Sequence, residues 1–172
     1  MIHLETERLI LRNYRAEDFD DVYAYFNNAE VAEYEDFYPM SEGEVREMIS
    51  GWSGKDSRLV AQLKEQHTVI GSIGYFIGDD GEYSIDFDFN PAYGKRGYAT
   101  EAGNELLNHL FNTLNINKIF GDCDVRNTNS WRLLERLGFK RVSQMDGASY
   151  KDDADGNPIL ISIFLYCLEI IN

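Results

Sequence analysis

The chain has 172 residues, which suits one domain with a single hydrophobic core, so we expect residues 1–172 to fold as one unit. Its 44% hydrophobic content argues against disorder, and no apolar run approaches the ~20 residues of a membrane span. The net charge of −14 argues against nucleic-acid binding and is compatible with cationic substrates. Charges near the start of the chain fall where a signal peptide would be apolar, which predicts a cytoplasmic protein.

The first third of the chain predicts one strand and two helices. Residues 4–13 alternate in a strand-like way. Residues 15–28 have apolar side chains at helical spacing and acids in the first turn, where the helix dipole favours them. Ser41 and Glu44 form a capping-box pattern that predicts a second helix over residues 41–52.

The rest of the chain alternates between strands and helices. An Asp-Asp-Gly turn between two apolar strands predicts an antiparallel meander, and Gly138 predicts the end of a short helix. The complete order predicts an α+β fold, a mainly antiparallel twisted sheet of about seven strands flanked by about four helices. After the second helix we expect strands over residues 57–64, 67–78, 83–90, 116–125, 139–145 and 159–168, and helices from residue 98 and over 130–137.

Cysteines and histidines give no sign of a metal site. Cys123 and Cys167 lie in apolar strand-like runs without a CxxC partner, so we expect buried reduced thiols. His3, His67 and His109 are isolated from one another in the sequence. We therefore predict no bound metal.

The stretch NPAYGKRGYATEA, residues 90–102, is basic and glycine-rich in an acidic chain. It precedes a predicted helix, whose first N–H groups and positive dipole end bind phosphate. Gly94 and Gly97 permit close approach, and Lys95 and Arg96 add positive charge. A plain strand-to-helix connection with surface cations is the alternative. The pattern is neither a dinucleotide fingerprint nor a P-loop, so another phosphate ligand is needed.

Three segments together resemble a known family. They are LETERLILRNYRAEDFDDV, NPAYGKRGYATEA and DVRNTNSWRLLERLGF, in that order. The chain resembles the GNAT superfamily of acetyl-CoA-dependent N-acetyltransferases, and within it the ribosomal-protein N-terminal (RimJ/RimL-like) type. The resemblance extends from about residue 4 to 141 and implies a GNAT-like fold. It also implies acetyl-CoA as cosubstrate and admits a homodimer, although no patch in the sequence identifies an interface.

The resemblance implies a cofactor site in two parts. Gly97 and Ala99 match the family's pyrophosphate loop, whereas Gly94 replaces its Gln or Arg. The pyrophosphate is then left to the neighbouring cations and to backbone amides. Glu101 stands in the helix's first turn, where stabilisation of the helix dipole is the favoured role over catalysis. The implied phosphate-binding residues are Lys95, Arg96, Gly97, Tyr98, Ala99 and Thr100.

Asn127 and Ser130 match the second part of the family's cofactor site. The resemblance implies that Asn127 reaches the pantetheine arm and that Ser130 lies near the thioester sulfur. Both also suit a structural role, as helix N-cap and N3 residue. Leu134 stands where many members have the Tyr that protonates the departing thiolate. Ser130 is therefore our candidate proton donor, with Tyr150 or Tyr166 as the other option.

The candidate bases lie on the strand before the phosphate loop. Asp86 and Asp88 share one strand face by alternation, and either could take the amine's proton, although an exposed acidic face is the simpler explanation. Backbone N–H groups near Asp88 and Phe89 would polarise the thioester carbonyl. Tyr34 and Asp36 lie in an acidic, aromatic segment that suits an ammonium group.

The loop after residue 149 is the other candidate for acceptor binding. Tyr150 precedes a cluster of three acids, and loops often carry specificity. Turn chemistry alone also explains this cluster. Its acids are Asp152, Asp153 and Asp155.

These patterns together predict acetyl transfer from acetyl-CoA to a primary amine, by direct attack in a ternary complex. The acceptor could be a protein N-terminus or a small-molecule amine. One alternative is a catalytically inactive acyl-CoA-binding regulatory domain. The other is a phosphate- or nucleotide-binding module of a different fold.

Overall fold

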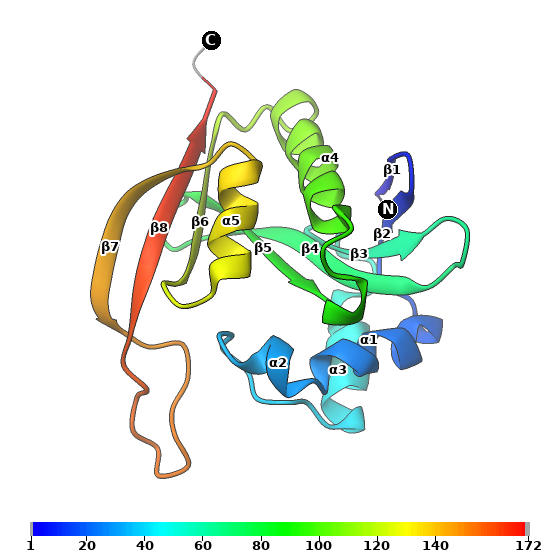
Figure 1. Cartoon of the computed structure of the whole chain (residues 1–172). Coiled ribbons are helices and arrows are strands. Elements are labelled where there is room, and N and C mark those ends of the chain that lie inside the picture. The colour runs from blue at the N-terminus through cyan, green and yellow to red at the C-terminus, as the bar shows by residue number, and fades with distance from the viewer. Residues whose placement is uncertain (1, 171–172) are drawn as a thin grey trace.

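The computed structural model describes residues 2–170, which form one sheet with helices on both of its faces (Figure 1). Within this range the sheet has eight strands in the order β1-β2-β3-β4-β5-β6-β8-β7. The predicted α+β class and mainly antiparallel sheet are confirmed, since only the β5–β6 pair is parallel among the described strands. The strands are β1 (His3–Glu5), β2 (Leu9–Arg12), β3 (Arg58–Leu63), β4 (Val69–Ile77), β5 (Tyr83–Phe89), β6 (Lys118–Asp124), β7 (Lys140–Ala148) and β8 (Ile161–Glu169).

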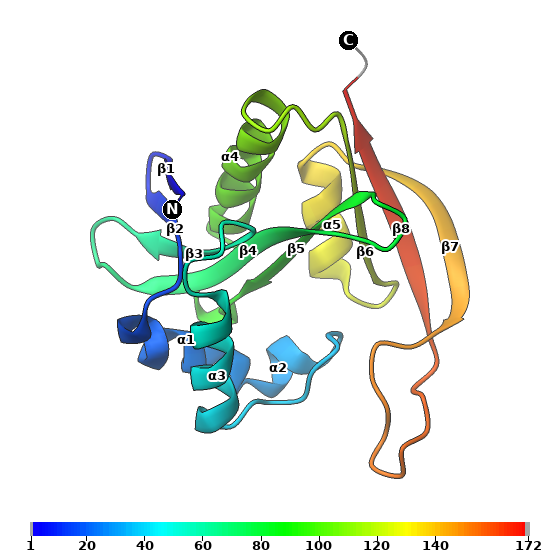
Figure 2. The ribbon, with the colours of Figure 1, turned by 180° about the vertical axis from the view of Figure 1, so that it is seen from behind.

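The helices form two groups, as the front and back views show (Figures 1 and 2). The first three lie together below the sheet in Figure 1, where the first and the third pack on one of its faces, and the last two lie side by side on the opposite face. In the described chain they are α1 (Phe19–Phe26), α2 (Ala29–Ala32), α3 (Glu42–Trp52), α4 (Tyr98–Asn112) and α5 (Thr128–Arg136), with 3-10 turns at Ala16–Asp18 and Pro91–Tyr93.

Alternation along the strands divides the interior into two cores. Leu59 and Ala61 of β3 pack in the cluster that contains the apolar residues of α4 and α5. Val60, between them, packs with the residues of α1 and α3. Successive side chains of a strand point to opposite faces, so β3 is apolar throughout because both of its faces are covered.

The parallel pair β5–β6 opens the sheet. These strands pair only near their starts, at Tyr83 with Ile119 and Ser84 with Phe120. Beyond these pairs each strand continues without the other, to Phe89 and to Asp124. Because the strands run parallel, both end at the same edge of the sheet. The connections to α4 and α5 therefore begin on either side of this opening.

Two details of the predicted fold are wrong. The expected single strand over residues 4–13 is a hairpin of β1 and β2, which raises the strand number from about seven to eight. Thr6 closes the turn, because its Oγ1 accepts from the amide of Leu9 at 2.9 Å and its own amide donates to the Leu9 carbonyl at 3.0 Å. The short helix α2 was also not predicted, and with it the described chain has five helices rather than about four.

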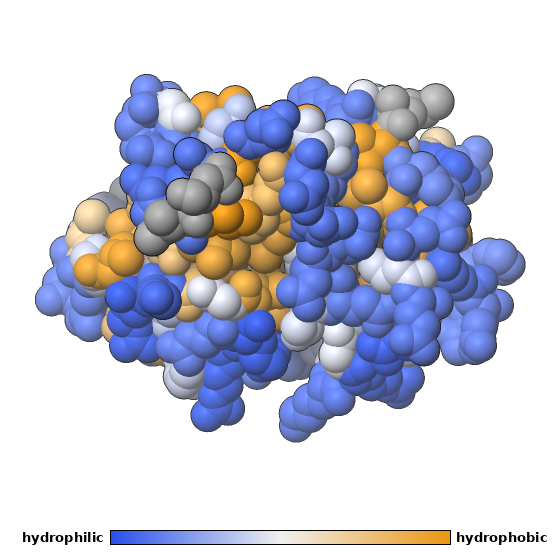
Figure 3. Space-filling view, turned by 90° about the horizontal axis from the view of Figure 1, so that it is seen from above, coloured by the Kyte–Doolittle hydropathy of each residue, from blue (hydrophilic) through white to orange (hydrophobic). Residues whose placement is uncertain are grey.

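On the face seen from above, apolar side chains gather between hydrophilic ridges (Figure 3). None of the helices in residues 2–170 is long and apolar enough to span a bilayer. The expected homodimer stays a prediction.

Candidate active site

A cavity of about 500 Å³ lies at the opening between β5 and β6. Its wall combines the ends of these strands with the start of α5 and with the segment that follows α2. Six residues predicted to act in catalysis or acceptor binding line it, namely Tyr34, Asp36, Asp86, Asp88, Ser130 and Tyr150, as does Asn127 of the predicted cofactor site. The other candidates, Tyr166, Asp152, Asp153 and Asp155, do not line it.

The start of α4 offers bare backbone amides. Gly97 is the N-cap with φ +81°, a left-handed conformation that suits glycine, and no side chain caps this helix. Among the described residues, nothing accepts a hydrogen bond from the amides of Gly97 through Thr100. Uncapped amides and the positive end of a 15-residue helix together form an anion site. The residues present therefore fit the pyrophosphate of acetyl-CoA.

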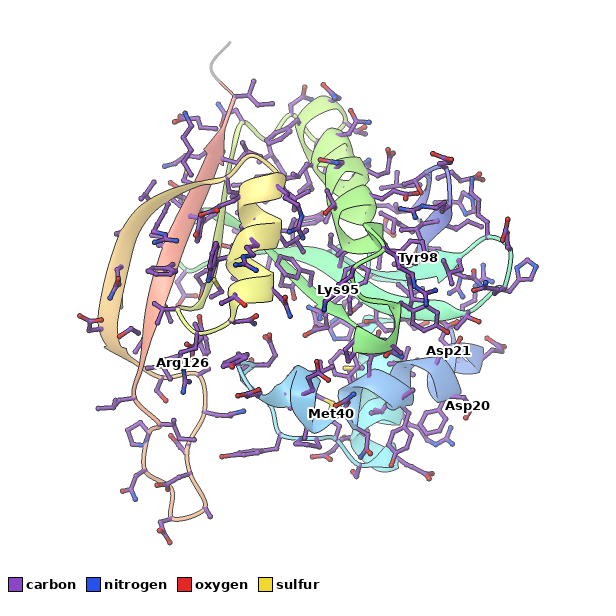
Figure 4. The ribbon with its side chains drawn as sticks, in the orientation of Figure 1. Asp20, Asp21, Met40, Lys95, Tyr98 and Arg126 are labelled. Atoms are coloured by element: carbon purple, nitrogen blue, oxygen red, sulfur yellow. The ribbon has the colours of Figure 1, made fainter. Side chains whose placement is uncertain are left out.

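Four cationic side chains lie at or near the start of α4. Lys95 and Arg96 are exposed in the turn before the helix, and Figure 4 shows Lys95 with Tyr98 above Met40, which belongs to the segment after α2. Sequence reasoning missed the other two cations. Arg8 of the β1–β2 turn donates from Nη1 to the Arg96 carbonyl at 2.9 Å and lies over the Tyr98 ring at 4.4 Å.

The second missed cation comes from α5. Arg136 donates from Nε to Oγ1 of Thr100 at 3.2 Å, which ties the two helices together. Neither Arg8 nor Arg136 adjoins the turn in sequence, and only the fold brings them there. A local basic site therefore exists in a protein with a net charge of −14.

Glu101 binds the β1–β2 turn, a structural role that the sequence did not predict, and its place in the first turn of α4 also suits the helix dipole. Its carboxylate accepts hydrogen bonds from Thr6 Oγ1 at 2.5 Å and from the Arg8 amide at 2.8 Å, and it pairs with the Arg8 guanidinium at 2.6 Å. Although partial burial opposes the shift, these donors hold the pKa of Glu101 below its usual value. Glu101 fixes the β1–β2 turn against α4, and both oxygens of its carboxylate are hydrogen-bonded there.

The start of α5 carries the second predicted cofactor residues. Asn127 is the N-cap, and its Oδ1 accepts from the Ser130 amide at 3.1 Å, which confirms the predicted capping pair. The Ser130 side chain lies on the cavity wall beside Cys123, where burial raises the pKa of that thiol to about 12. Cys123 thus stays a thiol at neutral pH, and both cysteines are free.

Leu134, one turn further along α5, is 1% exposed and also lines the cavity. No phenol is present where many family members have one. Tyr166 does not replace it, because its hydroxyl bonds to Arg141 and Glu135 and the residue does not line the cavity.

Asp86 and Asp88 share one strand face as predicted, but both are held by Arg58. The guanidinium of Arg58 pairs with both carboxylates. The strand register places Gly74 between Arg58 on β3 and Asp86 on β5, and the missing side chain leaves room for the contact. Asp88 is 8% exposed, so an exposed acidic face does not describe it. Burial raises the pKa of Asp88, and Arg58 opposes that shift.

The unpaired edge of β5 is where the backbone N–H groups predicted to polarise the thioester carbonyl would lie. Phe89 ends β5 and pairs with Gly71 of β4, whereas its other edge has no partner from β6. Backbone groups on that free edge face the opening. The assignment of amides near Asp88 and Phe89 as donors to the thioester carbonyl stays a prediction.

Two chain segments that contribute to the cavity wall, residues 34–37 and the loop of Tyr150, are joined beside it. Tyr38 donates from its hydroxyl to the Asp152 carbonyl at 2.6 Å. Lys151 donates from Nζ to the Ala32 carbonyl at 2.6 Å and to the Phe37 carbonyl at 3.3 Å. These bonds join the end of α2 and the segment after it to the β7–β8 loop, and we call them the acceptor bridge.

Tyr150 points from the same loop into the cavity wall. Its hydroxyl donates to Oδ2 of Asp122 at 2.6 Å, and burial together with the Asp122 charge raises the pKa of the phenol. The three acids of this loop, Asp152, Asp153 and Asp155, make different contacts. Asp153 accepts from the amides of Asp155 and Asn157, which is turn chemistry, while only the backbone of Asp152 enters the acceptor bridge.

Glu35 is a cavity residue that sequence reasoning did not single out. It lines the cavity within the acidic, aromatic segment noted from the sequence. Burial raises the pKa of Glu35 to about 8, helped by the negative charges of Asp88 and Asp36. Nothing local predicts this value, because it arises where three separate segments of the chain meet.

No cluster of three or more metal-ligating side chains occurs in the part of the chain that the structure describes.

Comparisons with known proteins agree with this geometry. The family model described as acetyltransferase (GNAT) domain matches residues 8–140. A protein named uncharacterized N-acetyltransferase p20, from Bacillus licheniformis, is 30% identical over 173 residues, covering 96% of this chain and 94% of that protein. Another named uncharacterized N-acetyltransferase YnaD, from Bacillus subtilis, is 27% identical and covers 81% of this chain and 84% of that protein.

A solved structure supports the fold. The crystal structure of a GNAT-family acetyltransferase from Bacillus anthracis superposes with a TM-score of 0.88 at 24% identity, covering 98% of each chain. The family match also overturns the alternative of a nucleotide-binding module with a different fold. The chain belongs to the GNAT family of acetyltransferases and is an N-acetyltransferase.

Proposed function

We propose that the protein transfers the acetyl group of acetyl-CoA to a primary amine, by direct attack in a ternary complex. The observation that carries this proposal is the run of bare amides from Gly97 through Thr100 beside the opening of β5 and β6. One ligand can bind its pyrophosphate there and extend its pantetheine arm between the diverging strands. Bound acetyl-CoA would supply the activated acyl group.

The residues of the chain have separate tasks in this proposal. The amides at the start of α4, with Lys95 and Arg96 beside them, bind the pyrophosphate. Asn127 hydrogen-bonds the pantetheine arm, and Ser130 gives a proton to the departing sulfur. Such proton transfer contributes typically about 100-fold or more to a rate.

The cavity wall favours a cationic acceptor. Six carboxyl groups line it, against the single cation Arg58, among residues 2–170. Aromatic rings surround these charges, and carboxylates with aromatic faces together attract ammonium groups. The acidic residues are Glu35, Asp36, Asp86, Asp88, Asp122 and Asp124, and the rings include Tyr34, Phe37, Trp52 and Tyr75.

The acceptor bridge favours a small amine over a protein N-terminus. Lys151 and Tyr38 join the β7–β8 loop to the end of α2 and the segment after it, which restricts the entry of a folded protein into the cavity. A volume of about 500 Å³ suits a small molecule, since ligand pockets commonly measure about 300–1,000 Å³. Assignment to the RimJ/RimL-like type stays a prediction.

An acetyl-CoA consumption screen tests the proposal. The panel holds linear diamines, monoamines of equal length, aminoglycosides and short peptides with free N-termini. Release of free thiol together with an acetylated product, seen by mass spectrometry, supports it. Binding of coenzyme A without turnover on any amine would instead favour the inactive acyl-CoA-binding domain. An intact cavity with Ser130 on its wall speaks against that alternative.

A further inference from the structure

The carboxyl groups of the cavity differ in what already binds them. Asp86 and Asp88 are paired with Arg58. A carboxylate held by a guanidinium is stabilised as an anion and has less affinity for a proton. Arg58 already occupies both carboxylates, and it opposes the rise that burial gives to the pKa of Asp88, so neither carboxylate is open to an incoming ammonium group.

Two more carboxylates are engaged at the end of β6. Asp122 accepts a hydrogen bond from the hydroxyl of Tyr150 at 2.6 Å. Asp124 is 1% exposed and pairs with Arg126 at 2.5 Å, so the pKa of Asp124 is held below its usual value despite its burial. Neither group is free to accept a proton from a ligand.

Glu35 and Asp36 remain, and their settings differ. Asp36 is exposed to solvent, whereas Glu35 is half-buried on the cavity wall. The Glu35 carboxyl makes no hydrogen bond and no ion pair with any residue between 2 and 170. A partly desolvated carboxylate without a donor gains more from a proton than a paired one does.

We infer that Glu35 removes the proton from the acceptor amine, a role that rests on the acetyl transfer proposed above. The ammonium N–H bond breaks, and its proton passes to a Glu35 carboxylate oxygen, directly or through one water. The nitrogen lone pair then bonds to the acyl carbon as the carbon–sulfur bond breaks. The second proton lost by the nitrogen replaces the proton that Ser130 gives to the sulfur, and Glu35 returns its proton to solvent.

The groups around Glu35 explain its basicity. Burial has the largest effect, negative charges on two strands and on its own segment add to it, and Arg58 opposes them. A base whose pKa lies near the working pH is the most effective one. The facing groups are Glu33, Tyr34 and Asp36 on its own segment, Arg58 on β3, Tyr75 on β4, Asp86 and Asp88 on β5, Asp122, Cys123 and Asp124 on β6, Arg126 after β6, and Tyr150 and Lys151 on the β7–β8 loop.

Glu35→Gln tests the inference, with Asp36→Asn as the matched control that removes the neighbouring charge. For the wild-type enzyme, kcat/KM with an acceptor from the screen should rise with pH to a midpoint near 8. Glu35→Gln should lower kcat about 100-fold or more and abolish that rise. The Kd for coenzyme A, by calorimetry, should stay within threefold and show that the variant is folded. Asp36→Asn should raise the acceptor KM and keep a rise of kcat/KM with pH, with its midpoint moved to lower pH, because the Asp36 charge helps to raise the pKa of Glu35.

Each outcome decides one point. A Glu35→Gln variant with wild-type kcat and an unchanged pH profile would overturn the inference and leave acetyl transfer intact. NMR titration of the Glu35 carboxyl gives a readout without turnover, and a midpoint near the usual 4.5 would also overturn it. A wild-type enzyme that acetylates no amine would refute the proposed function itself, and the role of Glu35 with it.

Discussion

Gly97→Val should separate ligand binding from folding at the start of α4. The residue has φ +81°, which costs a non-glycine residue about 1–2 kcal/mol. An added Cβ would lie 3.5 Å from Nη2 of Arg8, an ordinary contact, so backbone strain accounts for the loss of stability. Binding should suffer more, because the branched side chain blocks the amides. Losing two hydrogen bonds to a charged phosphate costs about 3–6 kcal/mol, or at least about 100-fold in Kd.

Gly81→Val is the matched control. Gly81 has the same φ of +81°, and an added Cβ there meets no atom within 4 Å. It lies in the turn between β4 and β5, away from α4. Both variants should lose similar free energy of unfolding in denaturant titrations. Calorimetry with coenzyme A should show a loss of affinity for Gly97→Val alone. If Gly97→Val binds within threefold of wild type, the phosphate site is misplaced.

Three further variants test other parts of the account. Ser130→Ala should lower kcat at least about 10-fold with the Kd for coenzyme A within threefold, and an unchanged kcat would remove Ser130 from the mechanism. Arg58→Met should lower the free energy of unfolding in urea by about 3–5 kcal/mol, because Asp88 stays buried without its partner; a loss below about 1 kcal/mol would contradict the importance of this pair. Glu35→Gln should remove a pH dependence of stability. Since the folded pKa of Glu35 is raised from 4.5 to about 8, wild-type stability should fall between these values by up to about 1.4 kcal/mol per pH unit, and equal pH slopes for both proteins would be the contrary result.

Local patterns predicted what depends on neighbours in sequence. Asn127 caps α5 as expected, and Ser41 with Glu44 forms the expected capping box of α3. The alternation of Asp86 and Asp88 on one strand face is also confirmed by their shared contact with Arg58. These features involve residues two or three positions apart, where helix and strand geometry alone fixes the arrangement.

The parts that could not be predicted depend on contacts between distant segments. Arg58 reaches Asp86 only because the strand register puts Gly74 between them. Thr6 and Arg8 in the β1–β2 turn bind Glu101, which lies more than ninety positions later in the sequence. Because this distant contact holds the turn, the apolar pattern of residues 4–13 looks like one strand although the segment is a hairpin. The acidic, aromatic composition around Glu35 was visible, but its burial required the fold.

The most direct test of the account is the response of the backbone amides to coenzyme A in a nitrogen-15 NMR titration. Saturable shifts should appear at Gly97 through Thr100 and at Asn127, because the proposed site holds the pyrophosphate and the pantetheine arm there. The turn at Gly81 should not respond. If coenzyme A binds and shifts amides elsewhere while residues 97–100 stay unchanged, the central claim is wrong.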